Sequence, residues 1–193
     1  MERLFEHINK FSEVSEEDLK LIESVVSKKV IQKKDHLLTT GHKCHHKYFI
    51  LSGCMRSYFV NKKGAEQIVN FGIENWWMTD YDSFVNESIS HINIQALENC
   101  EVLRLSKSDF DDIVSISPAL NNYFRVILEK RHIADQRRIQ YMFNMSGEEI
   151  FDHFNNSNPD FVQRIPQYML ASYLGFTPEF LSKIRKKKAE TGS

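Results

Sequence analysis

The chain has 193 residues, a mass of 22.7 kDa and a formal net charge of −1 at pH 7. Its 41% hydrophobic and 12% aromatic content excludes an intrinsically disordered chain, and no apolar run approaches the roughly 20 residues needed to cross a bilayer. Three cysteines are widely spaced, and the first residues lack a basic region followed by an apolar stretch. We therefore expect a cytoplasmic location and no disulfide framework.

Charge is unevenly distributed along the chain. Residues 163–193 hold six basic and two acidic side chains, a local charge of +4, so the rest of the chain carries −5. A basic end on an otherwise acidic chain favours contact with phosphates, but a charged run is also typical of an ordinary solvated face.

The first half of the chain predicts two short helices followed by a β-rich domain. Residues 1–25 place apolar side chains at helical spacing, and Ser15 with Asp18 resembles a capping box that opens the second helix. From about residue 28 to residue 106, short alternating runs are separated by turn signals, which predicts an antiparallel roll or barrel. The expected strands cover residues 28–32, 48–52, 55–60, 66–71, 92–97 and 101–105.

A long helix is expected next. Ser117 is a suitable N-cap, Pro118 suits the first turn, and no further Gly or Pro occurs before Gly147. This allows roughly 26–28 helical residues. One apolar stripe repeats every seven residues and a second runs beside it. The first contains Ile113, Leu120, Ile127, Ala134 and Tyr141, and the second contains Phe124, Leu128, Ile139 and Met142. Such a helix can pair with a second subunit; the alternative is one helix buried within a monomer.

Residues 165–185 predict two short helices joined by a tight turn, the helix-turn-helix of a DNA-binding protein. Gly175 can adopt a left-handed conformation at the turn, Thr177 is a good N-cap, and Pro178 suits the first helical position. The inward positions are expected to be Leu170, Ala171, Leu174, Leu181 and Ile184. An ordinary αα-hairpin is the alternative.

Three segments together resemble the Crp/Fnr transcriptional regulators. Residues 48–56 (YFILSGCMR) and 96–103 (ALENCEVL) are similar to strands of a cyclic-nucleotide-binding roll, and residues 163–185 are similar to the family's helix-turn-helix. The resemblance implies an α+β protein with a jelly-roll-like sensor domain at 1–115. It further implies a long connecting and dimerisation helix at 116–145 and a DNA-binding domain at 146–193. It also implies a homodimer on a near-palindromic DNA site, with RNA polymerase as a further candidate partner.

Carried over by position, Glu179 and Lys183 would contact bases. A glutamate can accept from a cytosine amino group, and a lysine can donate to guanine O6 and N7. The expected phosphate contacts are Thr177, Ser182, Arg185, Lys186 and Lys187. Because few residues follow the motif in this sequence, we expect no two-stranded wing after it.

The sensor departs from the pattern of the family. Cyclic-nucleotide binders of this family use a Gly-Glu pair and an arginine followed by Ser or Thr, but here Ser90 and His91 occupy the latter positions. No arginine or lysine occurs between Lys63 and Arg104. Without an arginine guanidinium group to bind the phosphate, we expect no binding of cyclic AMP in the usual way.

An apolar pocket for an unidentified effector is one alternative for the sensor. Its candidate lining is Trp76, Trp77, Tyr81, Phe84 and His91. These aromatic side chains can equally fill the interior of the roll.

A metal-dependent, cupin-like or ligand-binding protein without DNA activity is the alternative function. Its candidate ligands would be His42, Cys44, His45 and His46, but adjacent residues of a strand point to opposite faces. We therefore expect no metal, no cofactor and no catalytic residue, and the DNA-binding regulator is the favoured interpretation.

Overall fold

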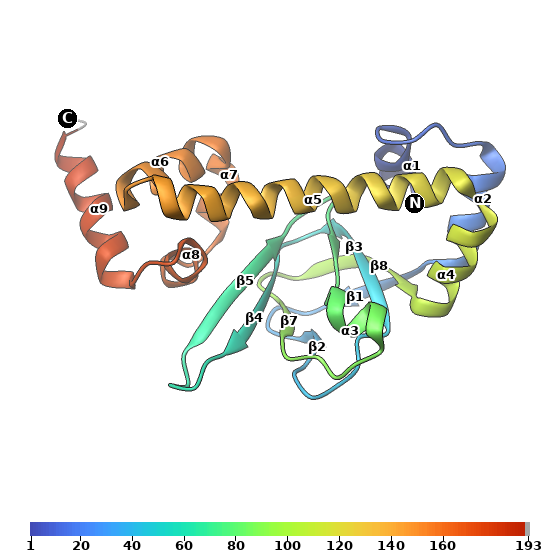
Figure 1. Ribbon diagram of the computed structural model, residues 1–193, viewed down its shortest axis with the longest axis horizontal. Helices are drawn as coiled ribbons and strands as arrows, with labels where there is room; N and C mark the ends of the chain where they lie inside the picture. The colour runs from blue at the N-terminus through green and yellow to red at the C-terminus, as the bar shows by residue number, and fades with distance from the viewer. Residues whose placement is uncertain (192–193) are drawn as a thin grey trace. The chain divides into compact units, whose positions relative to one another are not determined.

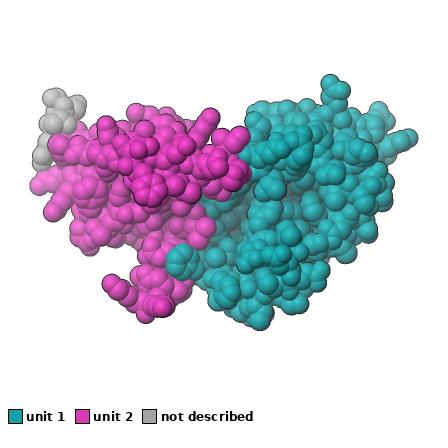
Figure 2. Space-filling view, in the orientation of Figure 1, with its two compact units in different colours: residues 1–59, 70–131 teal, residues 60–69, 132–193 magenta. Residues whose placement is uncertain are grey.

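The computed structural model describes residues 1–191, with side chains as far as Lys188. The chain divides into two compact units, shown in Figure 2. Unit 1 comprises residues 1–59 and 70–131, and unit 2 comprises residues 60–69 and the chain from His132 onward. No helix in the described part of the chain has the length and apolar character required to span a membrane.

Two four-stranded sheets form the framework of the β-rich region within residues 1–191 (Figure 1). Their strand orders are β1-β8-β3-β6 and β2-β7-β4-β5. Strand β8 pairs antiparallel with β1 and β3, and β7 pairs antiparallel with β2 and β4. The strands are β1 (Ser27–Ile31), β2 (His36–Leu38), β3 (His46–Ser52), β4 (Met55–Val60), β5 (Glu66–Gly72), β6 (Trp77–Met78), β7 (Asn93–Ala96) and β8 (Cys100–Ser106). The expected α+β architecture with an antiparallel roll is confirmed.

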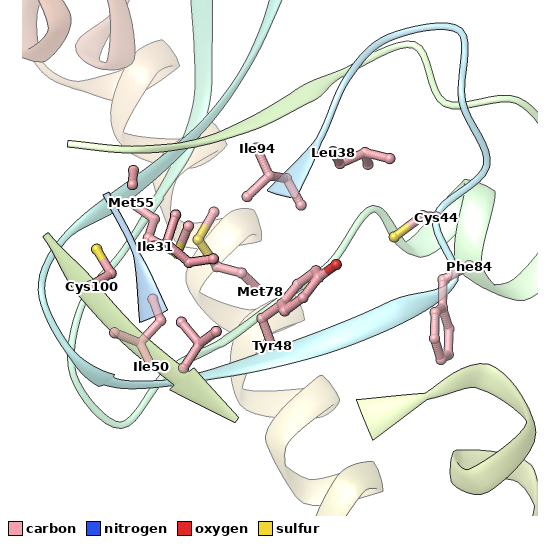
Figure 3. Packing of buried hydrophobic residues seen from close by; sticks show 12 residues of the cluster. Ile31, Leu38, Cys44, Tyr48, Ile50, Met55, Met78, Phe84, Ile94 and Cys100 are labelled. Atoms are coloured by element: carbon pink, nitrogen blue, oxygen red, sulfur yellow. The ribbon is translucent and has the colours of Figure 1, made fainter. Parts of the chain in front are cut away.

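Side chains of strand β3 point alternately to its two faces and so contribute to two hydrophobic clusters. Tyr48 and Ile50 belong to the cluster in which side chains of both sheets meet, shown in Figure 3. Phe49 points to the other face and joins a second cluster with residues of the flanking helices. Because successive side chains of a strand point to opposite faces, one strand can hold both layers.

Within the described residues, unit 1 contains five helical segments, and all of them except α3 contribute side chains to the second cluster, on the outer face of the first sheet. They are α1 (Glu2–Asn9), α2 (Glu16–Val25), α3 (Tyr81–Asn86), α4 (Lys107–Ile116) and the first part of α5 (Pro118–Asn144). The expected capping box is confirmed: Ser15 Oγ accepts from the Asp18 N–H, and the Asp18 carboxylate accepts from the Ser15 N–H. The long helix is also confirmed at 27 residues. Assigning Ile113 to it was wrong, because Ile113 lies on α4, which ends before Pro118.

A partly buried hydrogen-bond chain links three elements of unit 1. The Trp77 indole N–H donates to the Tyr123 hydroxyl oxygen (2.8 Å), and His7 Nδ1 lies 2.7 Å from the same oxygen. An indole can only donate, so the Tyr123 oxygen accepts from Trp77, and the Tyr123 O–H can donate to Nδ1 of a neutral His7 in the tautomer that leaves this nitrogen unprotonated. Burial, aided by the nearby Lys10 charge, lowers the pKa of His7 to about 4.

Unit 2 is a helical assembly with its own core. Its helices are α6 (Gly147–Ser157), α7 (Pro159–Arg164), α8 (Gln167–Leu174), α9 (Pro178–Thr191) and the end of α5. The tip of the β4–β5 hairpin belongs to the same unit. There the Ile68 N–H donates to Ser172 Oγ (3.0 Å), and Arg138 donates to the Val69 carbonyl (2.9 Å) while lying over the Tyr173 ring.

Candidate nucleic-acid interface

The turn between α8 and α9 has the geometry that the sequence predicts. Gly175 adopts φ +80°, and its N–H donates to the Ser172 carbonyl (3.2 Å), while the Phe176 N–H donates to the Ala171 carbonyl (2.8 Å). These two bonds define a Schellman motif, which satisfies the last carbonyls of α8 and turns the chain sharply. A side chain other than hydrogen at residue 175 would be strained by the positive φ.

The start of α9 is fixed by a local cap and by the core beneath it. The Phe180 N–H donates to Thr177 Oγ1 (3.2 Å), so Thr177 is the N-cap and Pro178 opens the helix. The five expected inward residues are all buried in one cluster with side chains of α6 and α7. They are Leu170, Ala171, Leu174, Leu181 and Ile184. Their packing sets which face of α9 is left to solvent.

The exposed face of α9 carries the two candidate base-contacting residues. Glu179, Lys183 and Lys187 are spaced by four residues, so they form one row along the helix, and all three are exposed. No ion pair involves Lys183 or Arg185 in the part of the chain that the structure describes. The candidate phosphate-contacting residues Thr177, Ser182, Arg185 and Lys186 are exposed as well.

A hollow of about 390 Å³ lies between the start of α8 and the face of α9. Its lining consists of Gln167, Pro178, Ser182, Arg185 and Lys186, so two cations and no acid border it. Pro166, the N-cap of α8, forms no side-chain cap hydrogen bond, and the first N–H groups of the helix lack a cap there. The hollow can therefore accept an oxyanion such as a phosphate group.

Gln167 is a residue of this hollow that sequence reasoning missed. Its Oε1 is buried and has no hydrogen-bond partner among the described residues. Its position directly after Pro166, at the start of the first helix of the motif, was the available signal.

The basic run at the end of α9 is partly engaged within unit 2. Lys187 Nζ lies 2.8 and 3.0 Å from the two carboxylate oxygens of Glu148, and Lys188 Nζ lies 2.5 Å from Asp152 Oδ2. Both acids lie on α6, 39 and 36 positions earlier in the chain. The sequence alone gave no sign of these pairs.

The five candidate pocket residues of the sensor lie in different environments. Trp76 and His91 are exposed, whereas Trp77 is buried beside Tyr123 and Phe124. Phe84 belongs to the buried cluster between the sheets, and Figure 3 shows it at the edge of this cluster, near Cys44. The structure therefore does not gather these side chains around one hollow, and the effector pocket stays a prediction.

Tyr81 and Phe84 instead surround a buried lysine. Lys47 Nζ lies 4.1, 4.5 and 4.7 Å from the ring centroids of Tyr81, Phe84 and Phe110, and the residue is only 3% exposed. Burial lowers the pKa of Lys47 to about 8, and the ring faces stabilise its charged form. This cation holds α3 and α4 on β3 and is withdrawn from solvent.

Ser90 and His91 stand where cyclic-nucleotide binders of the family carry an arginine followed by Ser or Thr, so neither position holds an arginine or a lysine. Ser90 is buried, and its hydroxyl bonds with Asp80 Oδ2 (2.7 Å) and the Ile92 carbonyl (3.0 Å). The nearby Cys44, His45 and His46 line a separate polar hollow of about 380 Å³. Among the described residues, no three His, Cys, Asp or Glu side chains are arranged to hold a metal ion.

Comparisons with known proteins agree with this arrangement. Residues 28–117 match the family model of the cyclic nucleotide-binding domain. The regulatory protein HlyX of Actinobacillus pleuropneumoniae is 24% identical over 192 residues, which cover 93% of this chain and 79% of the relative. The fumarate and nitrate reduction regulatory protein of Vibrio cholerae is 26% identical over 191 residues, covering 92% and 76%.

Solved structures share the fold at low identity. The c-di-GMP-responsive global regulator CLP of Xanthomonas campestris has a TM-score of 0.72 and 14% identity, over 92% of this chain and 93% of that one. FixK2 of Bradyrhizobium japonicum has a TM-score of 0.70 and 13% identity, over 87% and 86%. The curated relatives are regulatory proteins and not enzymes, so the metal-cupin alternative is not favoured.

Proposed function

Because this chain belongs to the Crp/Fnr family of transcription regulators, we propose that it regulates transcription by binding double-stranded DNA through α9. One observation carries the proposal: the turn at Gly175 and the core under α9 leave Glu179 and Lys183 in one exposed row. A helix presented in this way fits the major groove, where side chains near its N-terminus reach base edges.

The roles within the interface follow from chemistry and exposure. Glu179 accepts from a cytosine amino group, and Lys183 donates to guanine. Thr177, Ser182, Arg185, Lys186 and Lys187 contact phosphates, which fix the register and supply affinity that falls with salt. Gln167 joins them, because its amide lines the same hollow as Arg185 and Lys186.

A homodimer is the proposed form on DNA. Helix α5 exposes apolar side chains beyond those that pack on unit 1, including Leu128, Ile139 and Met142, each 46–53% exposed. Their spacing of eleven and three residues places them on one side of the helix. Covering them with a second copy would present two α9 helices to a near-palindromic site.

The proposed function also implies a division into domains, a location and further partners. Residues 1–115 form the sensor domain, 116–145 the connecting helix and 146–193 the DNA-binding domain, of which 192 and 193 lie outside the described residues. The cytoplasm is the proposed location, and RNA polymerase and a small-molecule effector are the further proposed partners.

The decisive test is selection of binding sites from a random DNA pool, followed by variants. Glu179→Ala should change the preferred base at one position of each half-site, a change in discrimination of about 1–3 kcal/mol. Asp160→Ala is a matched control, because it also removes an exposed acid from unit 2 but lies on α7. Unchanged preference in Glu179→Ala would show that the assigned reading face is wrong.

The sensor is proposed not to bind cyclic AMP in the usual way. The expected arginine position holds Ser90, whose hydroxyl is already bonded to Asp80. Calorimetric titration should give no binding at micromolar cyclic AMP, and a micromolar dissociation constant would contradict this assignment.

A further inference from the structure

Lys187 continues the row that contains Glu179 and Lys183, and it is paired with an acid of the same unit. Both carboxylate oxygens of Glu148 lie within 3.0 Å of Lys187 Nζ. The Lys187 side chain nevertheless remains 62% exposed, and that of Glu148 44% exposed. The ammonium group is thus on the DNA-facing side of α9 and already has an anionic partner.

The neighbouring pair has a different orientation. Lys188 lies four residues after Ile184 and seven after Leu181, which are the buried positions of α9. It therefore points toward the bundle, where Asp152 receives it. The Lys188–Asp152 pair joins α9 to α6, whereas the Lys187–Glu148 pair lies at the edge of the proposed reading face.

An exposed ion pair of this kind is weak enough to exchange. Exposed pairs between lysine and a carboxylate typically stabilise a protein very little, because water screens them and two long side chains must be ordered. A DNA phosphate arriving at Lys187 can therefore replace Glu148, but it must first displace the carboxylate. The net gain from that phosphate contact is smaller than for a lysine without an acidic partner.

We propose that Glu148 is an intramolecular competitor for DNA phosphate, which lowers the affinity of the α9 surface for DNA of any sequence by engaging Lys187. The inference rests on the proposed DNA-binding function. A lysine–phosphate contact carries no base information. Withholding it reduces the sequence-independent part of binding and leaves the contacts of Glu179 and Lys183 unchanged.

The experiment measures binding of the full chain to a selected duplex and to an unrelated duplex, by fluorescence anisotropy over a range of salt concentrations. Glu148→Gln keeps the shape of the side chain and removes its charge. We expect it to bind both duplexes about 2–5-fold more tightly at about 0.1 M salt, since it no longer opposes the phosphate. The slope of log K against log salt should become steeper by up to about 0.9, the value for one further phosphate contact.

Asp152→Asn is the matched control, since it removes the same charge from the same helix but releases the inward-pointing Lys188. It should leave the salt slope unchanged. In a protein that already carries Lys187→Ala, the added Glu148→Gln should change neither the DNA affinity nor the salt slope. Circular dichroism checks that each variant is folded.

The outcomes separate the two proposals. If wild type and all variants fail to bind DNA, the proposed function is wrong. If wild type binds and Glu148→Gln has the same affinity and slope, the competitor is wrong while the function stands. The competitor role of Glu148 would also be wrong if Asp152→Asn raised DNA affinity as much as Glu148→Gln does. The same holds if Glu148→Gln still raised the affinity in the Lys187→Ala background. Either result would show that removing any acidic charge from α6 strengthens DNA binding.

Discussion

The two units differ in how they use their cationic side chains. In unit 1, Lys47 and Arg56 are 3% and 4% exposed. Lys47 is enclosed by three aromatic rings, and Arg56 donates to Gln95 Oε1 and lies over the Tyr58 ring. In unit 2, Lys183 and Arg185 are exposed and form no ion pair within the described residues. The two buried cations of unit 1 are held within the fold, whereas Lys183 and Arg185 of unit 2 remain accessible to an anionic ligand.

This contrast explains why counting basic residues would not locate the proposed DNA-binding surface. A lysine that is buried against rings is unavailable to a phosphate, and one held by an acid is only partly available. What matters is the surface that the local core leaves uncovered. In unit 2 that surface is set by Leu181 and Ile184, which turn the opposite side of α9 to solvent.

The largest expected effect tests whether the core of unit 2 maintains the reading face. Leu170 is 0% exposed at the centre of that core, so Leu170→Ala should cost about 3–5 kcal/mol of stability through lost burial and a cavity. Both tryptophans, Trp76 and Trp77, lie in unit 1, so their fluorescence reports on the other unit. We expect DNA binding to be lost while tryptophan emission at 25 °C is retained.

A variant in the other unit completes this test. Ile50→Ala removes a side chain of equal burial from the core between the sheets and should change tryptophan emission during urea unfolding. If Leu170→Ala shifted the urea unfolding transition seen by tryptophan emission as strongly as Ile50→Ala does, the two units would not have separate cores.

The strands were predictable wherever alternation ran long enough. Strands β3, β4, β5 and β8 each have six or seven residues, and their expected positions were close to those found. Strands β2 and β6 have only three and two residues, too few for a periodic pattern. Helix α4 was missed although Ser106 and Asp109 carry a cap signal, and Ser106 Oγ does accept from the Asp109 N–H.

The candidate site was predictable where its geometry is local. Gly175 and Thr177 act through bonds to residues at most five positions away, so the turn and cap could be inferred from their order. The partners of Lys187 and Lys188 lie on another helix, and no spacing rule connects them. The same applies to Trp77, whose place beside Tyr123 depends on how α5 packs on the sheet.

The second prediction concerns the neutral histidine of unit 1. The folded pKa of His7 is about 4 and the unfolded value is about 6.5, so the unfolded chain binds more protons between these values. The contribution of neutral His7 to the stability of the folded state is therefore complete above about pH 6.5 and is lost as the pH falls toward 4. We expect a loss of about 1–2 kcal/mol in the free energy of unfolding, allowing for water that reaches the half-buried ring.

Urea unfolding followed by tryptophan fluorescence measures this loss at pH 7 and pH 4.5. His7→Gln is the control, because its amide oxygen can accept from Tyr123 and does not titrate. The variant should lose less stability on acidification than wild type. Some dependence will remain, since burial also lowers the pKa of His46. Equal pH dependence in the two proteins would show that His7 is not held neutral by unit 1.

The smallest expected effect separates available from engaged cations within α9 itself. Arg185 lines the hollow beside Gln167, whereas Lys188 is half-buried and bonded to Asp152. Arg185→Ala should weaken binding to every duplex by a few-fold and reduce the salt slope by about 0.9, because one phosphate contact is lost. Lys188→Ala removes an equal charge and should leave the slope unchanged. Equal loss of slope in both variants would mean that net charge alone determines DNA affinity, and the distinction between the two kinds of cation would not hold.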